Sequence, residues 1–139
     1  MAKIAVITPV SHLKGIKELI LEKCEEVFYC EDWSKDSIRS VLIDSDIDTI
    51  LCNPNQQTYK IDKDLLEGTK VKLINTCSTG MNHIDVKYCK QSNIKIHSLT
   101  RDYDLINDLP STSELAFGLL LCLLRSIPAG QKHVAEYKW

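Results

Sequence analysis

The sequence of 139 residues has few of the features that mark membrane, secreted or nucleic-acid-binding proteins. Its longest apolar run, residues 115–124, is too short to span a bilayer, and no secretory apolar segment follows the first residue. The formal net charge of −2 offers no basic surface for nucleic acid or an anionic membrane. The six cysteines include no C-x-x-C pair, and the four histidines do not lie beside them at zinc-ligand spacing. We therefore expect a cytoplasmic protein with reduced thiols, no metal site, and no nucleic acid or membrane as partner.

Short β-like runs recur at intervals of about 23 residues, and each is followed by a helical or polar segment. These units share a pattern of strand and helix but no residues, so they are not a sequence repeat. The five runs are residues 3–7, 26–29, 49–52, 72–75 and 95–98. Such alternation is typical of an α/β protein with a parallel sheet, right-handed crossovers and helices on both faces.

Helix signals lie between these runs. Apolar residues at three- and four-residue spacing predict an amphipathic helix over residues 13–24. Ser34 is placed to cap a second helix that runs towards Ile43. Residues 62–66 indicate one short turn of helix ended by Gly68. A further short helix is expected over residues 85–91, capped by Asn82 or Asp85.

Five parallel strands in so short a chain predict the flavodoxin-like strand order 2-1-3-4-5. In this arrangement ligands bind outside the carboxyl ends of the strands, where the winding reverses between the first and third strands. Three loops reach that edge, and all of them are polar, contain proline or glycine and lack acidic residues. They are residues 8–11, 53–56 and 77–81. The sheet alone therefore nominates a binding site.

Three rival functions of such a fold lack their motifs. A phospho-acceptor receiver domain needs an acidic pair after the first strand and an aspartate ending the third, where this chain has Thr8-Pro9 and Cys52-Asn53. Residues 9–15 contain only scattered elements of a flavin phosphate loop. No G-x-G-x-x-G occurs, which excludes the classical dinucleotide fingerprint.

The loop after the fourth strand has the most specific sequence. Ser78 and Thr79 supply hydroxyl groups, and Gly80 lets the backbone approach a ligand closely. Consecutive backbone N–H groups in such a turn can form an anion-binding nest, and the N-terminus of the next helix would also favour an anion. A purely structural interpretation is equally good, because Gly80 could simply make a tight turn from strand to helix.

Three segments together resemble the first part of the D-isomer-specific 2-hydroxyacid dehydrogenases. They are STGMNHID at residues 78–85, STSE at residues 111–114 before a long apolar helix, and AEYKW at residues 135–139. The resemblance covers most of the chain and is strongest after residue 71. It implies an NAD-dependent oxidoreductase that acts on a small D-2-hydroxy acid or 2-keto acid.

The resemblance also implies roles for particular residues. In the family the loop after this strand holds the substrate carboxylate through backbone amides, and the end of the third strand lies where the lid domain closes over the substrate. The substrate-binding residues implied in this way are Asn53, Ser78, Thr79 and Gly80. Asp85 would orient the loop, and Asn55 and Met81 are further candidates for specificity.

The family's cofactor motif and its catalytic arginine, glutamate and histidine all follow such a terminal Trp. None of them can be placed on this sequence, and His83, His97 and His133 lie outside the family's catalytic positions. The resemblance therefore implies NAD or NADP in an intact enzyme, with no catalytic residue and no cofactor site in these 139 residues, which would be truncated before that motif. The alternative is a stand-alone dimerising module that binds small anions, or a degenerate non-enzymatic remnant. The coding sequence beyond Trp139 would distinguish them.

The last part of the chain differs in character from the first. Residues 99–109 indicate a polar linker, and Ser111 and Glu114 have capping-box spacing at the start of a helix. That helix is apolar on every side over residues 115–124 and requires cover, which predicts a homodimer through residues 111–125. A further amphipathic helix is expected up to Trp139. We thus expect a substrate-binding domain over residues 1–98, and over residues 99–139 a linker with dimerisation helices at the edge of a cofactor domain.

Overall fold

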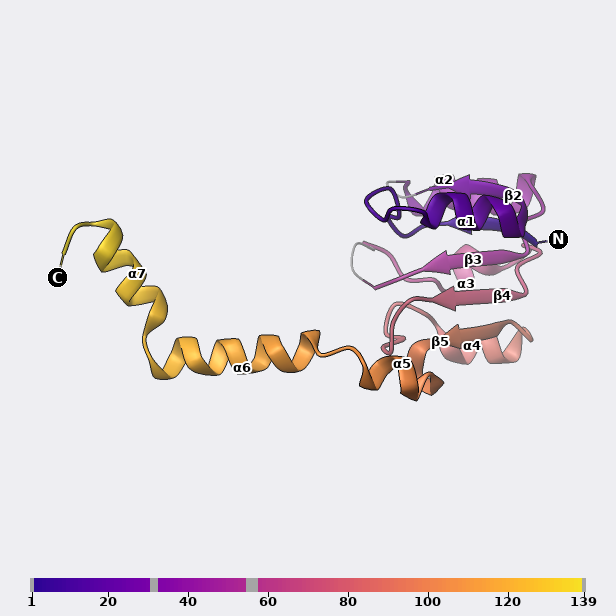
Figure 1. Ribbon diagram of the computed structural model, residues 1–139. Helices are drawn as coiled ribbons and strands as arrows, with labels where there is room; N and C mark the ends of the chain where they lie inside the picture. The colour runs from indigo at the N-terminus through magenta and orange to yellow at the C-terminus, as the bar shows by residue number, and fades with distance from the viewer. Residues whose placement is uncertain (1, 31–32, 55–57, 139) are drawn as a thin grey trace. The chain divides into compact units, whose positions relative to one another are not determined.

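The computed structural model describes residues 2–30, 33–54 and 58–138. In these residues five parallel strands form one sheet with the order β2-β1-β3-β4-β5 (Figure 1). The strands are β1 (Ala2–Val6), β2 (Cys24–Tyr29), β3 (Thr49–Cys52), β4 (Leu73–Thr76) and β5 (Lys95–Ser98). The flavodoxin-like order expected from the sequence is confirmed, and every strand overlaps its expected run.

Helices cover both faces of the sheet, as expected. They are α1 (Ile16–Lys23), α2 (Lys35–Asp44), α3 (Lys63–Leu66) and α4 (Val86–Gln91). Successive side chains of a strand point to opposite faces, so β1 contributes to two apolar clusters. Ile4 and Val6 join the smaller cluster with α1, whereas Ala5 and Ile7 join the larger cluster with the other three helices.

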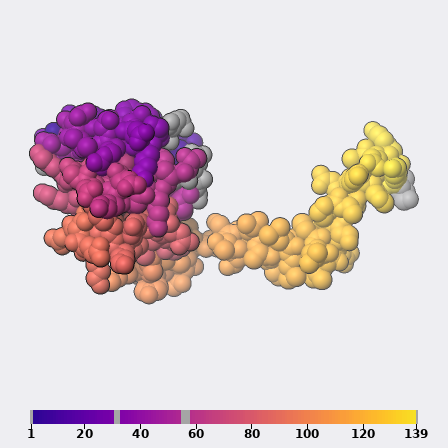
Figure 2. Space-filling view, turned by 180° about the vertical axis from the view of Figure 1, so that it is seen from behind, coloured from indigo at the N-terminus to yellow at the C-terminus, as the bar shows by residue number. Residues whose placement is uncertain are grey.

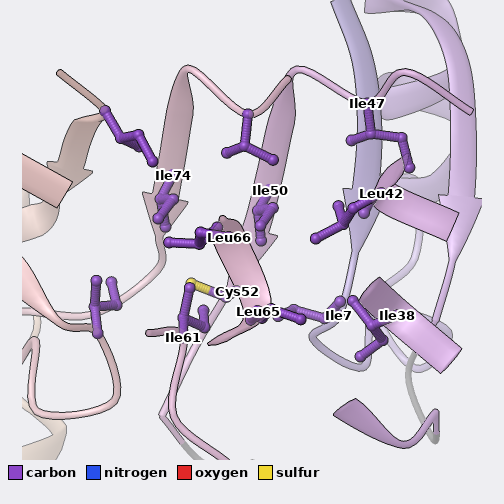
Figure 3. Close-up of a cluster of buried hydrophobic side chains, with 14 of the residues drawn as sticks. Ile7, Ile38, Leu42, Ile47, Ile50, Cys52, Ile61, Leu65, Leu66 and Ile74 are labelled. Carbon is purple, nitrogen blue, oxygen red and sulfur yellow. The ribbon is translucent and has the colours of Figure 1, made fainter. Parts of the chain in front are cut away.

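The larger cluster is the main core of the sheet unit. Isoleucine and leucine side chains from β3, β4, α2 and α3 meet there, and most of them are fully buried (Figure 3). Each such side chain stabilises the fold by roughly 1.5–3 kcal/mol relative to an exposed position. Figure 3 labels Ile7, Ile38, Leu42, Ile47, Ile50, Cys52, Ile61, Leu65, Leu66 and Ile74. This packing fixes the strand ends from which the loops of the expected site begin.

The two predicted N-caps are present, and α3 has an N-cap at Asp62 that was not predicted. The Ser34 hydroxyl accepts a hydrogen bond from the Ser37 N–H at 3.2 Å. Asp62 caps α3 through the Leu65 N–H, and Gly68 lies beyond the helix end with φ 80°. Of the two candidates for α4, Asp85 is the cap, because its Oδ1 accepts the Tyr88 N–H at 3.0 Å.

The first helix is shorter than the amphipathic pattern over residues 13–24 predicts. Residues 11–15 form turns, and Gly15 stands before α1 with φ 81°, a backbone conformation that cannot continue a helix. At the other end Cys24 already belongs to β2, and its N–H bonds the Ile20 carbonyl. The spacing of apolar residues predicted the helix, but it did not predict that Gly15 has a left-handed backbone conformation and that the helix begins only after it.

The remaining residues form a second, separate helical unit, from Asp102 to Trp139, while the first unit is Met1–Arg101. In Figure 2 the first unit is a closely packed body coloured from indigo to orange. The first unit includes the 3-10 helix η1 (Leu99–Arg101), and the second contains α5 (Tyr103–Asn107), α6 (Ser111–Leu124) and α7 (Ile127–Ala135). Most of the segment expected as a polar linker over residues 99–109 is helical, and its role as a linker stays a prediction. Trp139 lies outside the described residues.

The capping box expected at Ser111 is also wrong. Pro110 already has helical angles (φ −77°, ψ −11°), so Ser111 is the first helical residue and makes no side-chain cap. The first helix bond runs from the Glu114 N–H to the Pro110 carbonyl at 2.9 Å.

None of the residues of α6 and α7 is buried. In the part of the chain that the structure describes, no helix on its own has the length and apolar composition of a membrane span. The segments Tyr103–Leu124 and Ile127–Ala135 reach that length and composition only when taken together, and they are bent by 65° relative to each other.

A guanidinium group holds the end of α3 against α2. The last carbonyls of a helix have no partner within it and must find donors elsewhere. Arg39 on α2 supplies them, with Nη1 donating to the Asp64 carbonyl at 2.7 Å and the Leu65 carbonyl at 3.1 Å. Its Nη2 donates to the Glu67 carbonyl at 2.8 Å. The fork geometry of arginine allows these three bonds at once.

Arg39→Ala should therefore lower the free energy of unfolding by about 1–2 kcal/mol, because three carbonyls lose a charged donor. Urea unfolding followed by circular dichroism measures this change. Lys63→Ala, which removes an exposed ion pair with Glu67 on the same short helix, is the matched control and should cost less than about 0.5 kcal/mol. Equal losses in the two variants would contradict the role given to Arg39.

Candidate functional site

The three nominated loops begin at the same edge of the sheet. Two hydrogen bonds continue the strand pairing past the strand ends: the Ile7 N–H donates to the Leu51 carbonyl, and the Cys77 N–H donates to the Cys52 carbonyl, each at 2.9 Å. The chains that leave β1, β3 and β4 are therefore held beside one another (Figure 1). Asn53 and Ser78 lie at the first positions beyond these anchored ends of β3 and β4, and both are half-buried.

The loop after β4 is held through three successive carbonyl groups. The Ser78 carbonyl accepts the Leu99 N–H at 3.1 Å, and the Thr79 carbonyl accepts the Thr100 hydroxyl at 3.2 Å. The Gly80 carbonyl accepts the Ser78 hydroxyl at 2.7 Å. All three donors belong to the sheet unit, so the loop carbonyls are turned towards the protein.

This pairing determines where the loop N–H groups point. The described residues contain no cis peptide bond, and in a planar trans peptide the N–H points opposite to the C=O. The N–H groups of Thr79, Gly80 and Met81 therefore point away from the donors that hold the preceding carbonyls. None of the three donates to another backbone group in the part of the chain that the structure describes. Three successive unpaired N–H groups form an arrangement suited to an anion.

Gly80 has open space at the position where a side chain would begin. Its φ does not lie in the left-handed region, and a Cβ added there would meet no atom within 4 Å. Neither the turn nor the packing of this chain therefore requires glycine. The interpretation in which Gly80 only makes a tight turn has no support in the geometry, whereas close approach of a ligand to the backbone remains possible.

The expected contribution of the α4 N-terminus to anion binding is wrong. Asp85 places its own carboxylate there and accepts the Tyr88 N–H, so a negative charge already occupies the end of a six-residue helix. The Asp85 N–H is also used, because it donates to the Ile61 carbonyl at 2.8 Å. The candidate anion site is thus restricted to residues 79–81.

A buried histidine lies behind the loop. His83 is 9% exposed, and its Nε2 lies 3.0 Å from Thr76 Oγ1 and 3.6 Å from Cys52 Sγ. Burial lowers the pKa of His83 and raises the pKa of Cys52 to about 12, so both side chains are uncharged at neutral pH. His83 thus contacts the residues that shape the loop.

Several residues of this arrangement were missed in the sequence. Leu99 and Thr100 fall in no local motif, because their bonds join the end of β5 to the loop after β4. The one signal that could have found them is the strand order, which places the ends of β4 and β5 side by side. Thr76 was missed because it bonds Ser78 and His83 from inside the core. Of the other predicted residues, Met81 is half-buried next to the loop, and Asn55 lies outside the described residues.

The turn between β1 and α1 lacks the features of a dinucleotide-binding turn. The turn between β1 and α1 has the right place in a parallel sheet, but Gly15 is its only glycine and the first turn of α1 contains the acidic Glu18. A pyrophosphate at a helix N-terminus needs close backbone approach and no competing negative charge.

The burial of His83 predicts a pH dependence of stability. Because its folded pKa lies below the ordinary value of 6.5, the unfolded chain takes up a proton that the folded chain does not as the pH falls through that range. The free energy of unfolding should fall from about pH 7.5 to about pH 5, and His83→Gln should remove part of that fall. Urea unfolding at several pH values measures it. His97→Gln, at an exposed position of β5, is the control and should keep the wild-type fall; an unchanged fall in His83→Gln would refute the prediction.

Comparison with known proteins places this geometry in a family. The family model described as "D-isomer specific 2-hydroxyacid dehydrogenase, catalytic domain" matches residues 4–101, more than half of the chain. A hydroxypyruvate reductase of Thermotoga maritima is 27% identical over 127 residues, which are 91% of this chain and 38% of that protein. An erythronate-4-phosphate dehydrogenase of Bacteroides thetaiotaomicron is 38% identical over 80 residues, 58% of this chain and 21% of that protein.

Solved structures show the same fold. The NAD-dependent formate dehydrogenase from Staphylococcus aureus, in complex with NAD, superposes with a TM-score of 0.75 at 22% identity. The match covers 100% of this chain and 43% of that one, so the chain spans well under half the length of these relatives. The sheet order and the family match agree, and the chain belongs to the D-isomer-specific 2-hydroxyacid dehydrogenase family.

Proposed function

We propose that this chain is the substrate-binding part of an NAD-dependent oxidoreductase that acts on a small D-2-hydroxy acid or the corresponding 2-keto acid. The observation that carries the proposal is the row of three unpaired N–H groups at Thr79, Gly80 and Met81. They are fixed by the pairing of the preceding carbonyls and lie at the carboxyl edge of the sheet, where α/β proteins bind ligands.

The proposed role of the loop is to hold the substrate carboxylate. A carboxylate has two oxygens that accept several N–H bonds, and bonds to an ionised acceptor are about twice as strong as neutral ones. Because the donors are backbone groups held before the ligand arrives, little ordering remains to be done on binding. Ser78 supports the loop from behind through its bond to the Gly80 carbonyl. Asn53, beyond β3, is proposed to contact the substrate from the neighbouring loop.

The cofactor and the compartment belong to the same proposal. NAD or NADP would supply the redox chemistry in the proposed enzyme, and this loop would hold the substrate carboxylate in a fixed orientation. No cofactor site is proposed on residues 1–139. The six cysteines are all free thiols, which agrees with a reducing compartment such as the cytoplasm.

Hydroxypyruvate should bind to the chain saturably and shift the amide signals of residues 79–81 in ¹⁵N–¹H NMR spectra. Gly80→Val should weaken this binding about tenfold or more, because the added side chain occupies the open space where the carboxylate approaches. The folded spectrum should otherwise be retained, since no atom lies within 4 Å of the added Cβ.

Two controls accompany this titration. Gly130→Val, in open space on α7, should leave the affinity unchanged. Hydroxyacetone, which carries a methyl group in place of the carboxylate, should not shift residues 79–81. Wild-type affinity in Gly80→Val, or equal shifts with hydroxyacetone, would remove the loop from the site.

A second part of the proposal concerns the apolar helix. Leu119, Leu120 and Leu123 on α6 are 61%, 47% and 78% exposed, and the apolar side chains surround the helix on every side. Such a surface has to be covered in a stable protein. We propose a second copy of the chain as the cover, through residues 111–125. The alternative function, a stand-alone module that binds small anions, would use the same dimer.

Sedimentation velocity at tens of micromolar should therefore give a dimer for the wild-type chain. Leu120→Glu should shift it towards monomer, because a buried unpaired carboxylate at the interface costs several kcal/mol. Leu21→Glu, at an apolar position of α1 that is 58% exposed, should stay dimeric. A monomeric wild-type chain would contradict the proposed dimer. It would not bear on the proposal that residues 79–81 bind the substrate carboxylate.

A further inference from the structure

A chain of polar groups runs behind the loop, from the core to the Gly80 carbonyl. His83 Nε2 lies 3.0 Å from Thr76 Oγ1, and Thr76 Oγ1 lies 2.8 Å from Ser78 Oγ. Ser78 Oγ in turn donates to the Gly80 carbonyl at 2.7 Å. Thr76 is fully buried and His83 nearly so, which separates the inner half of this chain from water.

The direction of every hydrogen bond in this chain follows from counting protons. A hydroxyl group has one proton to donate. Ser78 gives its proton to the Gly80 carbonyl, which has none of its own, so Thr76 must donate to Ser78. The Thr76 proton is then used, and the remaining contact requires His83 Nε2 to donate to Thr76. The imidazole must therefore carry its proton on Nε2.

The other tautomer does not fit these contacts. With the proton on Nδ1, Nε2 would accept either from the Cys52 thiol at 3.6 Å or from Thr76. In the first case Nε2 and Thr76 Oγ1 would face each other at 3.0 Å with no proton between them. In the second case Ser78 would have to donate to Thr76 instead of Gly80. The Gly80 carbonyl would lose its partner, and the Met81 N–H would no longer be fixed in direction. Nδ1 is buried and has no partner among the described residues, so an Nδ1 proton there would also lack an acceptor.

The backbone around His83 is held independently of its side chain. The His83 carbonyl accepts the Ile61 N–H at 2.8 Å, and Ile61 and Ile84 form an isolated parallel bridge. The imidazole therefore starts from a fixed backbone position. Burial in this position keeps it neutral at pH 7, as the hydrogen-bond chain requires.

We propose that His83 is the positioning residue of the carboxylate loop: as the Nε2–H tautomer it directs Thr76 and Ser78 so that the Gly80 carbonyl is turned inward and the Met81 N–H outward. This inference rests on the proposed function for the meaning of the loop, but the geometry it describes exists without ligand. His83 acts through two hydroxyl groups and touches neither substrate nor cofactor, so it is not a catalytic residue.

The first test is made on the ligand-free chain. A long-range ¹H–¹⁵N correlation spectrum at pH 7 should show a protonated Nε2 and an unprotonated Nδ1 for His83. The amide signals of residues 79–81 should move in His83→Leu and in Thr76→Val, and should return towards wild type in His83→Gln, whose amide can again donate to Thr76. Thr76→Val is nearly isosteric and interrupts the chain even if His83→Leu fails to fold.

The second test is the affinity for hydroxypyruvate in the same variants. His83→Leu and Thr76→Val should weaken binding about tenfold, while His83→Gln should stay within about threefold of wild type. His97→Leu, at an exposed position of β5, is the matched control and should leave both the amide signals and the affinity unchanged.

The two proposals fail in different ways. A wild-type chain that does not bind hydroxypyruvate would contradict the proposed function, and the ligand-free spectra would still decide the role of His83. An Nδ1–H tautomer, or unchanged signals of residues 79–81 in folded His83→Leu and Thr76→Val, would overturn the role of His83. Equal shifts of the amide signals of residues 79–81 in His83→Gln and His83→Leu would also overturn the role of His83. In that case any replacement of the histidine would act through packing and not through the hydrogen bond to Thr76.

Discussion

The arrangement of the loop depends on one constraint: the three carbonyls of residues 78–80 are paired from inside the protein. A trans peptide group cannot turn its C=O inward without turning the following N–H outward. The strand order supplies the donors, because it places the end of β5, with Leu99 and Thr100, beside the end of β4. The proposed anion site would thus be a consequence of the fold and would need no charged side chain. None of the three loops contains an acidic residue that would repel a carboxylate.

The loop is also fixed at both of its ends. The Cys77 N–H continues the β3–β4 pairing, and the bridge between Ile61 and Ile84 holds the chain where it enters α4. Between these points the loop is held by the hydrogen bonds that run from His83 to Gly80, and not by apolar packing. A buried polar chain is stable only when every proton has an acceptor, so it specifies one loop conformation more strictly than apolar contacts would. The helical unit beyond Asp102 shows the opposite case, with apolar side chains exposed on all sides of α6.

Much of this could be predicted from the sequence, because the signals were local. Five short apolar runs at regular spacing gave the sheet order, and Ser34 and Asp85 marked helix starts. The errors arose where a single backbone conformation decided the outcome: Gly15 delays α1, and Pro110 displaces the capping box expected at Ser111. The site residues Ser78, Thr79 and Gly80 came from the family resemblance, and their substrate contacts stay a prediction. The partners that shape the loop lie about twenty residues away in sequence or face the core, and no pattern of neighbours identifies such contacts.

The central claim is that a substrate carboxylate is held by backbone amides of the loop after β4. A crystal structure of the protein with hydroxypyruvate bound tests this claim most directly. The account predicts carboxylate oxygens within about 3.2 Å of the backbone nitrogens of Thr79, Gly80 and Met81, with the Gly80 carbonyl still bonded to Ser78. A carboxylate bound elsewhere on the sheet edge, or a loop whose carbonyls turn outward in the complex, would contradict it.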